Sequence, residues 1–256
     1  WLRLEQVAAV RDFAAIAISC CKVRIQLSDP RECASGKGWN MLQIWGRKSS
    51  SNVQALMWCV GELGLVYERH DAGHIYGITD TDEFAQMNPN RTVPVLSDGE
   101  ETPLWETGAI LRYLANVYGR GPFWPEHPKQ RAQVDKWAEW SKINIALCFT
   151  GPVFWRVVRT PKPQQDPSAI ADAVQNLEAK LLIAERQLQN NEWLCGADFT
   201  LADIQFGHVL YRYFDIEIQR RDFPSLKRYF ETLMARDAYC EHVAISYEEL
   251  RASLPT

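Results

Sequence analysis

The chain has 256 residues, of which 46% are hydrophobic and 23% charged; this composition is typical of a folded globular protein and excludes disordered and collagen-like classes. Its formal net charge is −4, which argues against a general nucleic-acid binder, because phosphate contacts require a dense basic surface. No apolar run is long enough to span a bilayer, so we expect neither nucleic acid nor a membrane as a partner.

Residues 1–40 differ in character from the rest of the chain. They contain a short apolar run at 13–21, and the first methionine is Met41. Basic residues before that run suggest a targeting segment, but acidic residues interrupt them and no convincing cleavage site follows. We expect 1–40 to be upstream or non-native sequence, with a targeting segment or a genuine added element as the alternatives.

From Met41 the pattern predicts a small α/β domain. Residues 41–45 alternate apolar and polar positions as a strand does, and 65–69 has the pattern of a second strand. Between them, a serine run followed by Asn52 supplies cap residues for an amphipathic helix that ends at Gly64.

Two further strand segments, 93–96 and 102–105, bracket Asp98-Gly99 in the manner of a hairpin. Thr107 is then expected to cap a helix. This order of elements is typical of a thioredoxin-like domain, which we assign to 41–120.

The second half is predicted to be helical throughout. Residues 121–128 belong to a Pro- and Gly-rich segment that we interpret as a linker. Apolar residues then recur every three or four positions in 129–245, the pattern of a helical bundle. Thr200-Leu-Ala-Asp203 has the form of a capping box, and we assign 246–256 to a C-terminal tail.

The cysteines and histidines predict no metal site. The seven cysteines are scattered without a C-x-x-C pair, so we expect reduced, mostly buried thiols in a cytoplasmic protein. His70 and His74 are four residues apart, but Gly73 lies between them and no helical pattern surrounds them. We therefore expect a turn at this position.

Three segments resemble the glutathione transferase family. Asn88-Pro-Asn-Arg-Thr-Val-Pro-Val-Leu96 is similar to the stretch around that family's cis-proline. Trp105-Glu-Thr-Gly-Ala-Ile-Leu-Arg-Tyr-Leu114 resembles its E-S-x-A-I-L-x-Y-L segment, with threonine in place of serine, and Phe199-Thr-Leu-Ala-Asp-Ile204 resembles the capping box of its helical domain. The resemblance covers 41 to about 245 in the family's order.

This resemblance implies a thioredoxin-like domain followed by an all-α bundle, with glutathione as co-substrate, no metal and a small electrophile as the second substrate. It also implies a homodimer. Two other functions remain open: glutathione-dependent reduction of disulfides or peroxides, and a non-catalytic binding module of the same fold.

The start of the first helix is the expected catalytic position. Ser50 falls where serine-type transferases, the theta- and delta-like members, carry their thiolate-binding serine. Asn52 falls where a bacterial, nu-like subgroup has an asparagine that faces the sulfur. The turn contains neither Tyr nor Cys, which argues against the tyrosine-type and cysteine-type members. As an alternative, Ser50 and Asn52 could simply cap the helix.

The resemblance also implies the glutathione-binding residues. Glu106 would take the glutathione ammonium, and Thr107 with the following helix start would take the γ-glutamyl carboxylate. A cis bond at Pro94 would present the backbone of Val93 to the cysteinyl unit. Arg91 matches a position near the glycyl carboxylate, or is a solvated loop arginine.

The electrophile is expected between the Ser50 turn and the helical domain. Phe154, Trp155 and Arg159 belong to a segment that combines aromatic rings with cations. Such a segment could line a pocket for an aromatic or acidic substrate, or consist of core aromatics and surface arginines.

Overall fold

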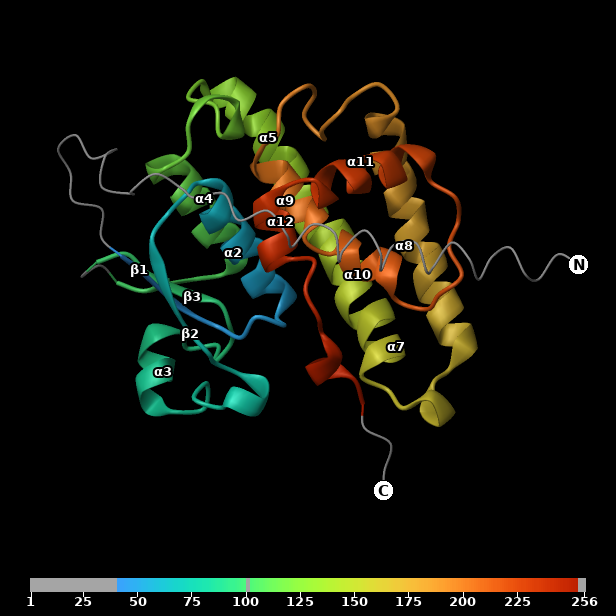
Figure 1. Ribbon diagram of the computed structural model, residues 1–256, viewed down its shortest axis with the longest axis horizontal. Coiled ribbons are helices and arrows are strands. Elements are labelled where there is room, and N and C mark those ends of the chain that lie inside the picture. Colours follow the sequence, from blue (N-terminus) through green and yellow to red (C-terminus); the bar gives the residue numbers. More distant parts are fainter. Residues whose placement is uncertain (1–40, 100–101, 253–256) are drawn as a thin grey trace, which may run out of the picture.

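The computed structural model describes residues 41–99 and 102–252, which form two packed domains (Figure 1). The expectations for residues 1–40, and for the last residues of the C-terminal tail, lie outside the described residues. An α/β domain carries the sheet and an all-α domain follows it, so the predicted fold class is confirmed.

The first domain is built on a four-stranded sheet in the order β2-β1-β3-β4. The central strand β1 (Leu42–Trp45) is parallel to β2 (Tyr67–His70) and antiparallel to β3 (Val95–Ser97), which pairs with β4 (Leu104–Trp105). Leu42 and Ile44 are buried on one face, as the predicted alternation requires. The remaining elements are α2 (Ser51–Glu62), a 3-10 turn at His74–Tyr76, α3 (Asp82–Met87) and α4 (Thr107–Val117).

Three local expectations need correction. Glu106 is the N-cap of α4, because its backbone has a positive φ of 68°, and Thr107 is the first helical residue. Strand β3 begins at Val95, since Pro94 has no N–H to contribute to the ladder. His70 ends a strand, whereas His74 does start a turn.

The second domain is a bundle of helices to the right of the sheet in Figure 1. The helices are α5 (Pro128–Trp140), α6 (Leu147–Phe149), α7 (Arg156–Val158), α8 (Pro167–Leu188), α9 (Leu201–Gly207), α10 (Leu210–Asp215), α11 (Pro224–Met234) and α12 (Asp237–His242), with 3-10 turns at Gly121–Phe123, Lys162–Gln164 and Glu248–Leu250. The predicted capping box at Thr200 is present.

Helices α5, α6 and α7 form one continuous helical stretch that is widened twice. Two π-helical segments, Ser141–Ala146 and Thr150–Trp155, interrupt it. Pro152 lies in the second segment and has no N–H to donate to the preceding turn, which accounts for the wider winding there. Such insertions often occur at functional sites: the second segment contributes Thr150 and Trp155 to the cavity described below, and Lys142 of the first segment contacts Asn52 in its wall.

Helix α2 packs against α9 and α12 and so joins the two domains. Its Trp58 is fully buried, and a Cβ on Gly207 of α9 would lie 2.9 Å from the Trp58 ring. Glycine is therefore what allows the two helices to approach. At the end of α2, Glu62 accepts hydrogen bonds from Arg236 at 2.7 and 2.5 Å. These contacts hold the C-terminal end of α2 against the helical domain.

The expectation that the thiols are mostly buried is wrong for the described cysteines. Of Cys59, Cys148, Cys195 and Cys240, which are all free, Cys59 alone is buried, and burial raises the pKa of its thiol. No helix in 41–99 or 102–252 is long and apolar enough to cross a membrane. Within the same ranges, no three His, Cys, Asp or Glu side chains are grouped as they would be around a metal ion.

Candidate active site

A cavity of about 360 Å³ lies where the two domains meet, at the start of α2. Its walls come from the loop before α2, the segments 73–79 and 91–93 of the first domain, and the helical stretch and C-terminal turn of the second domain. The residues that line it are Arg47, Ser49, Ser50, Ser51, Asn52, Gly73, His74, Thr79, Arg91, Thr92, Val93, Thr150, Trp155, Arg159, Arg212 and Leu250.

Ser50 is the N-cap of α2, yet its side chain makes no capping hydrogen bond. The backbone holds it in place, because its N–H donates to the Arg47 carbonyl at 3.2 Å and its carbonyl accepts from Gln54 at 2.8 Å. The side chain lines the cavity and the residue is 9% exposed. A hydroxyl that is free of the helix, beside the positive end of the helix dipole, is suited to bind an anion.

Asn52 lies in the same cavity wall and is tied to the second domain. Its Oδ1 accepts a hydrogen bond from Lys142 Nζ at 2.8 Å. Lys142 belongs to the first π-helical segment; burial lowers the pKa of its ammonium, and Glu106 and Glu139 act against that change. The contact places a positive charge next to the start of α2.

The expected glutathione-binding loop adopts the expected backbone. The Val93–Pro94 bond is cis. Val93 lies outside the strands, and its backbone N–H and carbonyl form no hydrogen bond with another backbone group in the part of the chain that the structure describes. Buried Asn88 shapes the loop, because its Nδ2 donates to the Thr92 carbonyl at 2.8 Å. Arg91 lines the cavity at its exposed edge, where its side chain donates to the Thr81 carbonyl at 3.0 Å.

Glu106 and Thr107 are not among the residues that line this cavity. Glu106 is exposed at the start of α4, and its side chain does not cap the helix. It acts electrostatically on Lys142, the residue that holds Asn52. The structure therefore brings the Glu106 region to the side of the cavity where Asn52 lies, whereas Thr107 is buried.

Comparison with known proteins decides the family. The family models described as "Glutathione S-transferase, N-terminal domain" and "Glutathione S-transferase, C-terminal domain" match residues 41–116 and 147–237. The chain belongs to the glutathione S-transferase family. It is therefore a glutathione transferase enzyme, as the motifs in its sequence implied.

Three known proteins match this transferase over nearly their whole length. "Glutathione S-transferase GstB" of Escherichia coli K12 is 34% identical over 206 residues, which span 80% of this chain and 99% of the relative. A solved theta class glutathione S-transferase from Xanthomonas axonopodis pv. citri, with glutathione bound, is 36% identical with a TM-score of 0.76, covering 81% of this chain and 99% of its own. A Bombyx mori glutathione transferase shares the fold with a TM-score of 0.73 at 21% identity, covering 82% and 96%.

The transferase places two of the three expected electrophile residues in the cavity wall. Trp155, which is 47% exposed, and Arg159 both line the cavity. Phe154 does not, because its ring is fully buried beneath the guanidinium of Arg212, 4.8 Å away. Successive residues of a helix point in different directions. Phe154 therefore lies in the core, while its neighbour Trp155 faces the cavity.

Several cavity residues of the transferase were missed by reasoning from the sequence. Arg47 lies two residues before the serine run, and its position close to the expected catalytic turn was the available signal. Arg212 is only 2% exposed; a charged residue inside the apolar pattern of α10 was its signal, because unpaired buried charges are rare. Nothing in the local sequence of Lys142 indicated its contact with Asn52.

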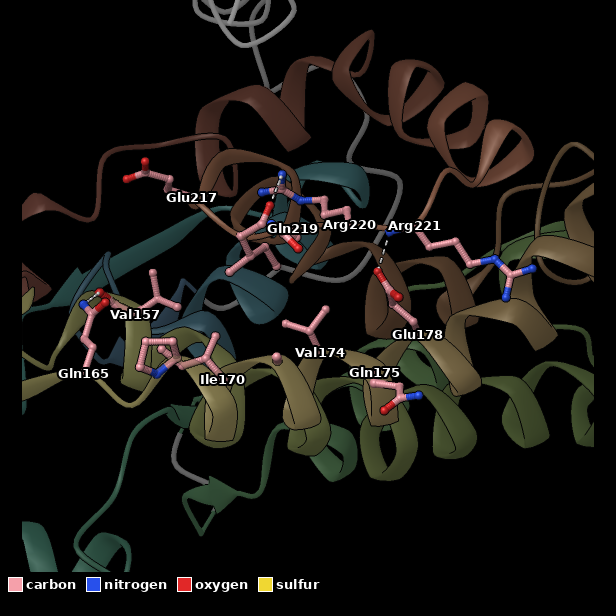
Figure 2. Close-up of a pocket in the computed structure, with 13 residues that line it drawn as sticks. Val157, Gln165, Ile170, Val174, Gln175, Glu178, Glu217, Gln219, Arg220 and Arg221 are labelled. Atoms are coloured by element: carbon pink, nitrogen blue, oxygen red, sulfur yellow. Dashed lines mark hydrogen bonds between the residues drawn. The ribbon is translucent and has the colours of Figure 1, made fainter. Parts of the chain in front are cut away.

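A second cavity, of about 660 Å³, lies on the transferase between α8 and the loop that precedes α11 (Figure 2). Its walls contain no hydroxyl, thiol or imidazole side chain. The guanidinium of Arg220 donates hydrogen bonds to the carbonyls of Tyr213 and Ile216. Glu178 accepts a hydrogen bond from the backbone N–H of Arg221. These walls lack a hydroxyl at a helix start, which the cavity at Ser50 provides, and we therefore take the cavity at Ser50 as the candidate active site.

Proposed function

We propose that this transferase joins the glutathione thiolate to a carbon atom of a small electrophile in the cavity beside Ser50. The observation that carries the proposal is the Ser50 hydroxyl, which lies at a helix start, lines the cavity and is not used by the helix. The glutathione bound in the Xanthomonas relative supports the same co-substrate here.

The energetics of this arrangement are sufficient for thiol activation. Lowering a thiol pKa from roughly 8.5 by about two units requires about 2.7 kcal/mol of preferential stabilisation of the thiolate. One hydrogen bond to a charged acceptor contributes roughly 1.5–3 kcal/mol, and a helix N-terminus contributes about 0.3–1 kcal/mol. A hydrogen bond from the Ser50 hydroxyl at the start of α2 would therefore suffice for a change of this size.

The remaining residues hold the tripeptide. The free backbone N–H and C=O of Val93 would pair with the cysteinyl unit as an added strand does. Glu106 would bind the ammonium while the start of α4 with Thr107 binds the adjacent carboxylate. Arg91 would meet the glycyl carboxylate at the exposed edge of the cavity.

The proposal is tested by the pKa of glutathione bound to the protein, followed by thiolate absorbance against pH. Ser50→Ala should raise that pKa by about one to two units. Asn52→Ala is the competing variant, because Asn52 is the expected donor of the nu-like, reductase alternative. Ser51→Ala is the matched control, one residue along the same turn.

A shift with Asn52→Ala alone would move the donor role to Asn52 and favour disulfide or peroxide reduction. A shift with Ser51→Ala alone would place the donor one residue later. If none of the three substitutions moves the pKa, the turn does not activate the thiol and the proposal fails.

We further propose a C2 homodimer that joins the first domain of one subunit to the helical domain of the other. Large apolar side chains are exposed on both domains, including Trp105 on the first and Ile143 and Leu147 on the second. Free cysteines fit a reducing, cytoplasmic location, and removal of reactive electrophiles fits a role in detoxification. Sedimentation of a stable monomer at micromolar concentration would contradict the dimer.

A further inference from the structure

Three arginines from separate parts of the chain line the cavity beside Ser50. Arg47 comes from the loop before α2, Arg159 from the end of α7, and Arg212 from α10. They are close enough to act on one another, since Arg159 lowers the pKa of Arg47, and both lower the pKa of Arg212. Positive charge has therefore been gathered at one wall of the cavity.

This charge is not neutralised within the part of the chain that the structure describes. None of the three guanidinium groups forms an ion pair with a carboxylate there. The Nε atoms of all three are buried and have no hydrogen-bond partner among residues 41–99 and 102–252. Buried donors without acceptors are costly and uncommon in proteins, so the arrangement calls for an anion.

Two of the three guanidinium groups, those of Arg159 and Arg212, lie over aromatic rings. Arg212 lies 4.8 Å from the ring centre of Phe154 and 5.6 Å from that of Tyr247, and it donates to the Ser49 carbonyl at 2.6 Å. Arg159 lies 4.9 Å from the ring centre of Trp155. Arginines fixed in this way present a preorganised set of donors to a carboxylate or another oxyanion.

A carboxylate of the protein itself already lies at the edge of this wall. Glu249, in the C-terminal 3-10 turn, accepts hydrogen bonds from the hydroxyls of Ser49 and Tyr76. Burial and Arg159 lower the pKa of Arg47, and the charge of Glu249 acts against that change, which places Glu249 within electrostatic reach of the cluster. It remains outside ion-pair distance of the three arginines, so their donors stay available.

We propose that the electrophile of this transferase carries an oxyanion group, such as a carboxylate, that binds Arg47, Arg159 and Arg212 while its reactive carbon faces the glutathione sulfur. The proposal rests on the proposed function and names its substrate class. The two carboxylates of glutathione are expected elsewhere, at Arg91 and at the start of α4. The exposed face of Trp155 suits an aromatic ring between the anion and the sulfur.

A matched pair of chromogenic substrates tests the proposal: 4-chloro-3,5-dinitrobenzoate and 4-chloro-3,5-dinitrobenzamide, which differ in the charge of one substituent. In both reactions a C–S bond forms at the carbon that bears chlorine. Chloride leaves with the bonding electron pair, and the thiol proton is released to solvent. The readout is the ratio of kcat/KM for the acid to kcat/KM for the amide, divided by the ratio of the uncatalysed rates.

The normalised ratio should exceed ten for the wild-type protein. It should fall about tenfold in Arg159→Gln and in Arg47→Gln, since each variant removes one cation from the wall. Arg156→Gln is the control, because Arg156 is in the same short helix as Arg159 but donates to the Ala169 carbonyl outside the cavity; its ratio should equal the wild-type value. Glu249→Gln should raise the ratio, because it removes the carboxylate beside Arg47.

Two results would overturn the proposal. One is a wild-type ratio near one that the arginine variants leave unchanged. The other is a loss of glutathione affinity in Arg47→Gln and Arg159→Gln at a constant ratio, which would assign the arginines to a glutathione carboxylate.

Binding of the benzoate without glutathione, followed by quenching of tryptophan fluorescence, separates this inference from the proposed function. Binding that Arg159→Gln weakens tenfold, in a protein that conjugates neither compound, would support the anion site and refute the transferase reaction at Ser50. Absence of both binding and conjugation would refute the anion site.

Discussion

The starts of α2 and α9 look alike in sequence and serve different purposes. Both begin with a hydroxyl residue, Ser50 and Thr200. At Thr200 the polar groups are used within the protein: its N–H and hydroxyl donate to Asp203 at 2.8 and 3.0 Å. At Ser50 the side chain makes no capping bond and faces a cavity. A cap whose hydrogen bonds are satisfied is structural, whereas an unused one is available to a ligand.

Two other helix starts extend the comparison. The first amides of α11 are satisfied by Glu185, a buried carboxylate from α8 that accepts from Ser225 and Leu226 at 3.1 and 2.8 Å. Helix α4 begins at Glu106, whose side chain does not cap it. The starts of α9 and α11 are thus closed by internal carboxylates, while the starts of α2 and α4, where we propose that glutathione binds, have no side-chain cap.

The largest change in stability is expected from removing Asp203, the carboxylate that closes the start of α9. Asp203→Ala should reduce the free energy of unfolding by about 3–5 kcal/mol. The reason is that Asp203 also accepts from the Leu194 N–H and the Tyr229 hydroxyl, both at 3.0 Å, so several buried donors lose their acceptor. Urea unfolding at pH 7.5 measures this loss, and Asp203→Asn, which keeps an acceptor oxygen, should lose less. A loss below about 1 kcal/mol would contradict the comparison.

Ser50→Ala should instead have a large effect on activity and a small effect on stability. It should lower kcat/KM by roughly ten- to a thousandfold, about 1.4–4 kcal/mol, while the free energy of unfolding changes by less than about 0.5 kcal/mol, because no capping bond is lost. Thr200→Ala is the counterpart and should cost about 1 kcal/mol of stability without changing the pKa of bound glutathione. If Ser50→Ala destabilised the protein as Thr200→Ala does, Ser50 would be an ordinary cap.

Glu106→Gln tests the second open start. Removal of the charge that is expected to bind the glutathione ammonium should weaken binding by about 1.5–3 kcal/mol. Glutathione affinity measured by calorimetry gives the effect, and the pKa of the bound thiol should stay close to its wild-type value. A shifted pKa with unchanged affinity would reverse the roles assigned to Glu106 and Ser50.

A smaller, pH-dependent effect is expected at the other end of α9. Burial lowers the pKa of His208 from 6.5 to about 3, and the charge of Lys142 adds to the change. Between these values the unfolded chain binds a proton that the folded protein does not. Through His208, stability should therefore decrease as the pH falls below 6.5, by about 2 kcal/mol at pH 5 relative to pH 7. Asp203, whose burial raises the pKa of its carboxyl to about 6, contributes in the opposite direction.

His208→Gln should remove this contribution, since glutamine does not titrate, so the variant should lose less stability than the wild-type protein between pH 7 and pH 5. Unfolding free energies of both proteins at pH 7 and pH 5 provide the measurement. If the unfolding free energies of the two proteins changed equally between pH 7 and pH 5, His208 would not be the cause of the pH dependence.

Much of the fold could be predicted because its signals are local. The alternation at 41–45, the Asp98-Gly99 hairpin and the capping box at Thr200 each depend on residues close together in the chain. The π-helical segments could not be predicted from the apolar spacing, and Glu106 replaced Thr107 as cap because of a single backbone angle. Element ends depend on such details more than on the hydrophobic pattern.

The sequence alone determined the family, the two-domain order and the position of Ser50 at a helix start, because motifs, periodicity and capping chemistry are properties of neighbouring residues. Only the tertiary structure decided that the Ser50 hydroxyl is unused, that Lys142 reaches Asn52, and that three arginines share one wall. Arg47 and Arg212 are 165 positions apart in the numbering, and neither side chain has a local pattern that requires the other. Their meeting follows from the packing of α2 against the helical domain, which no local pattern encodes.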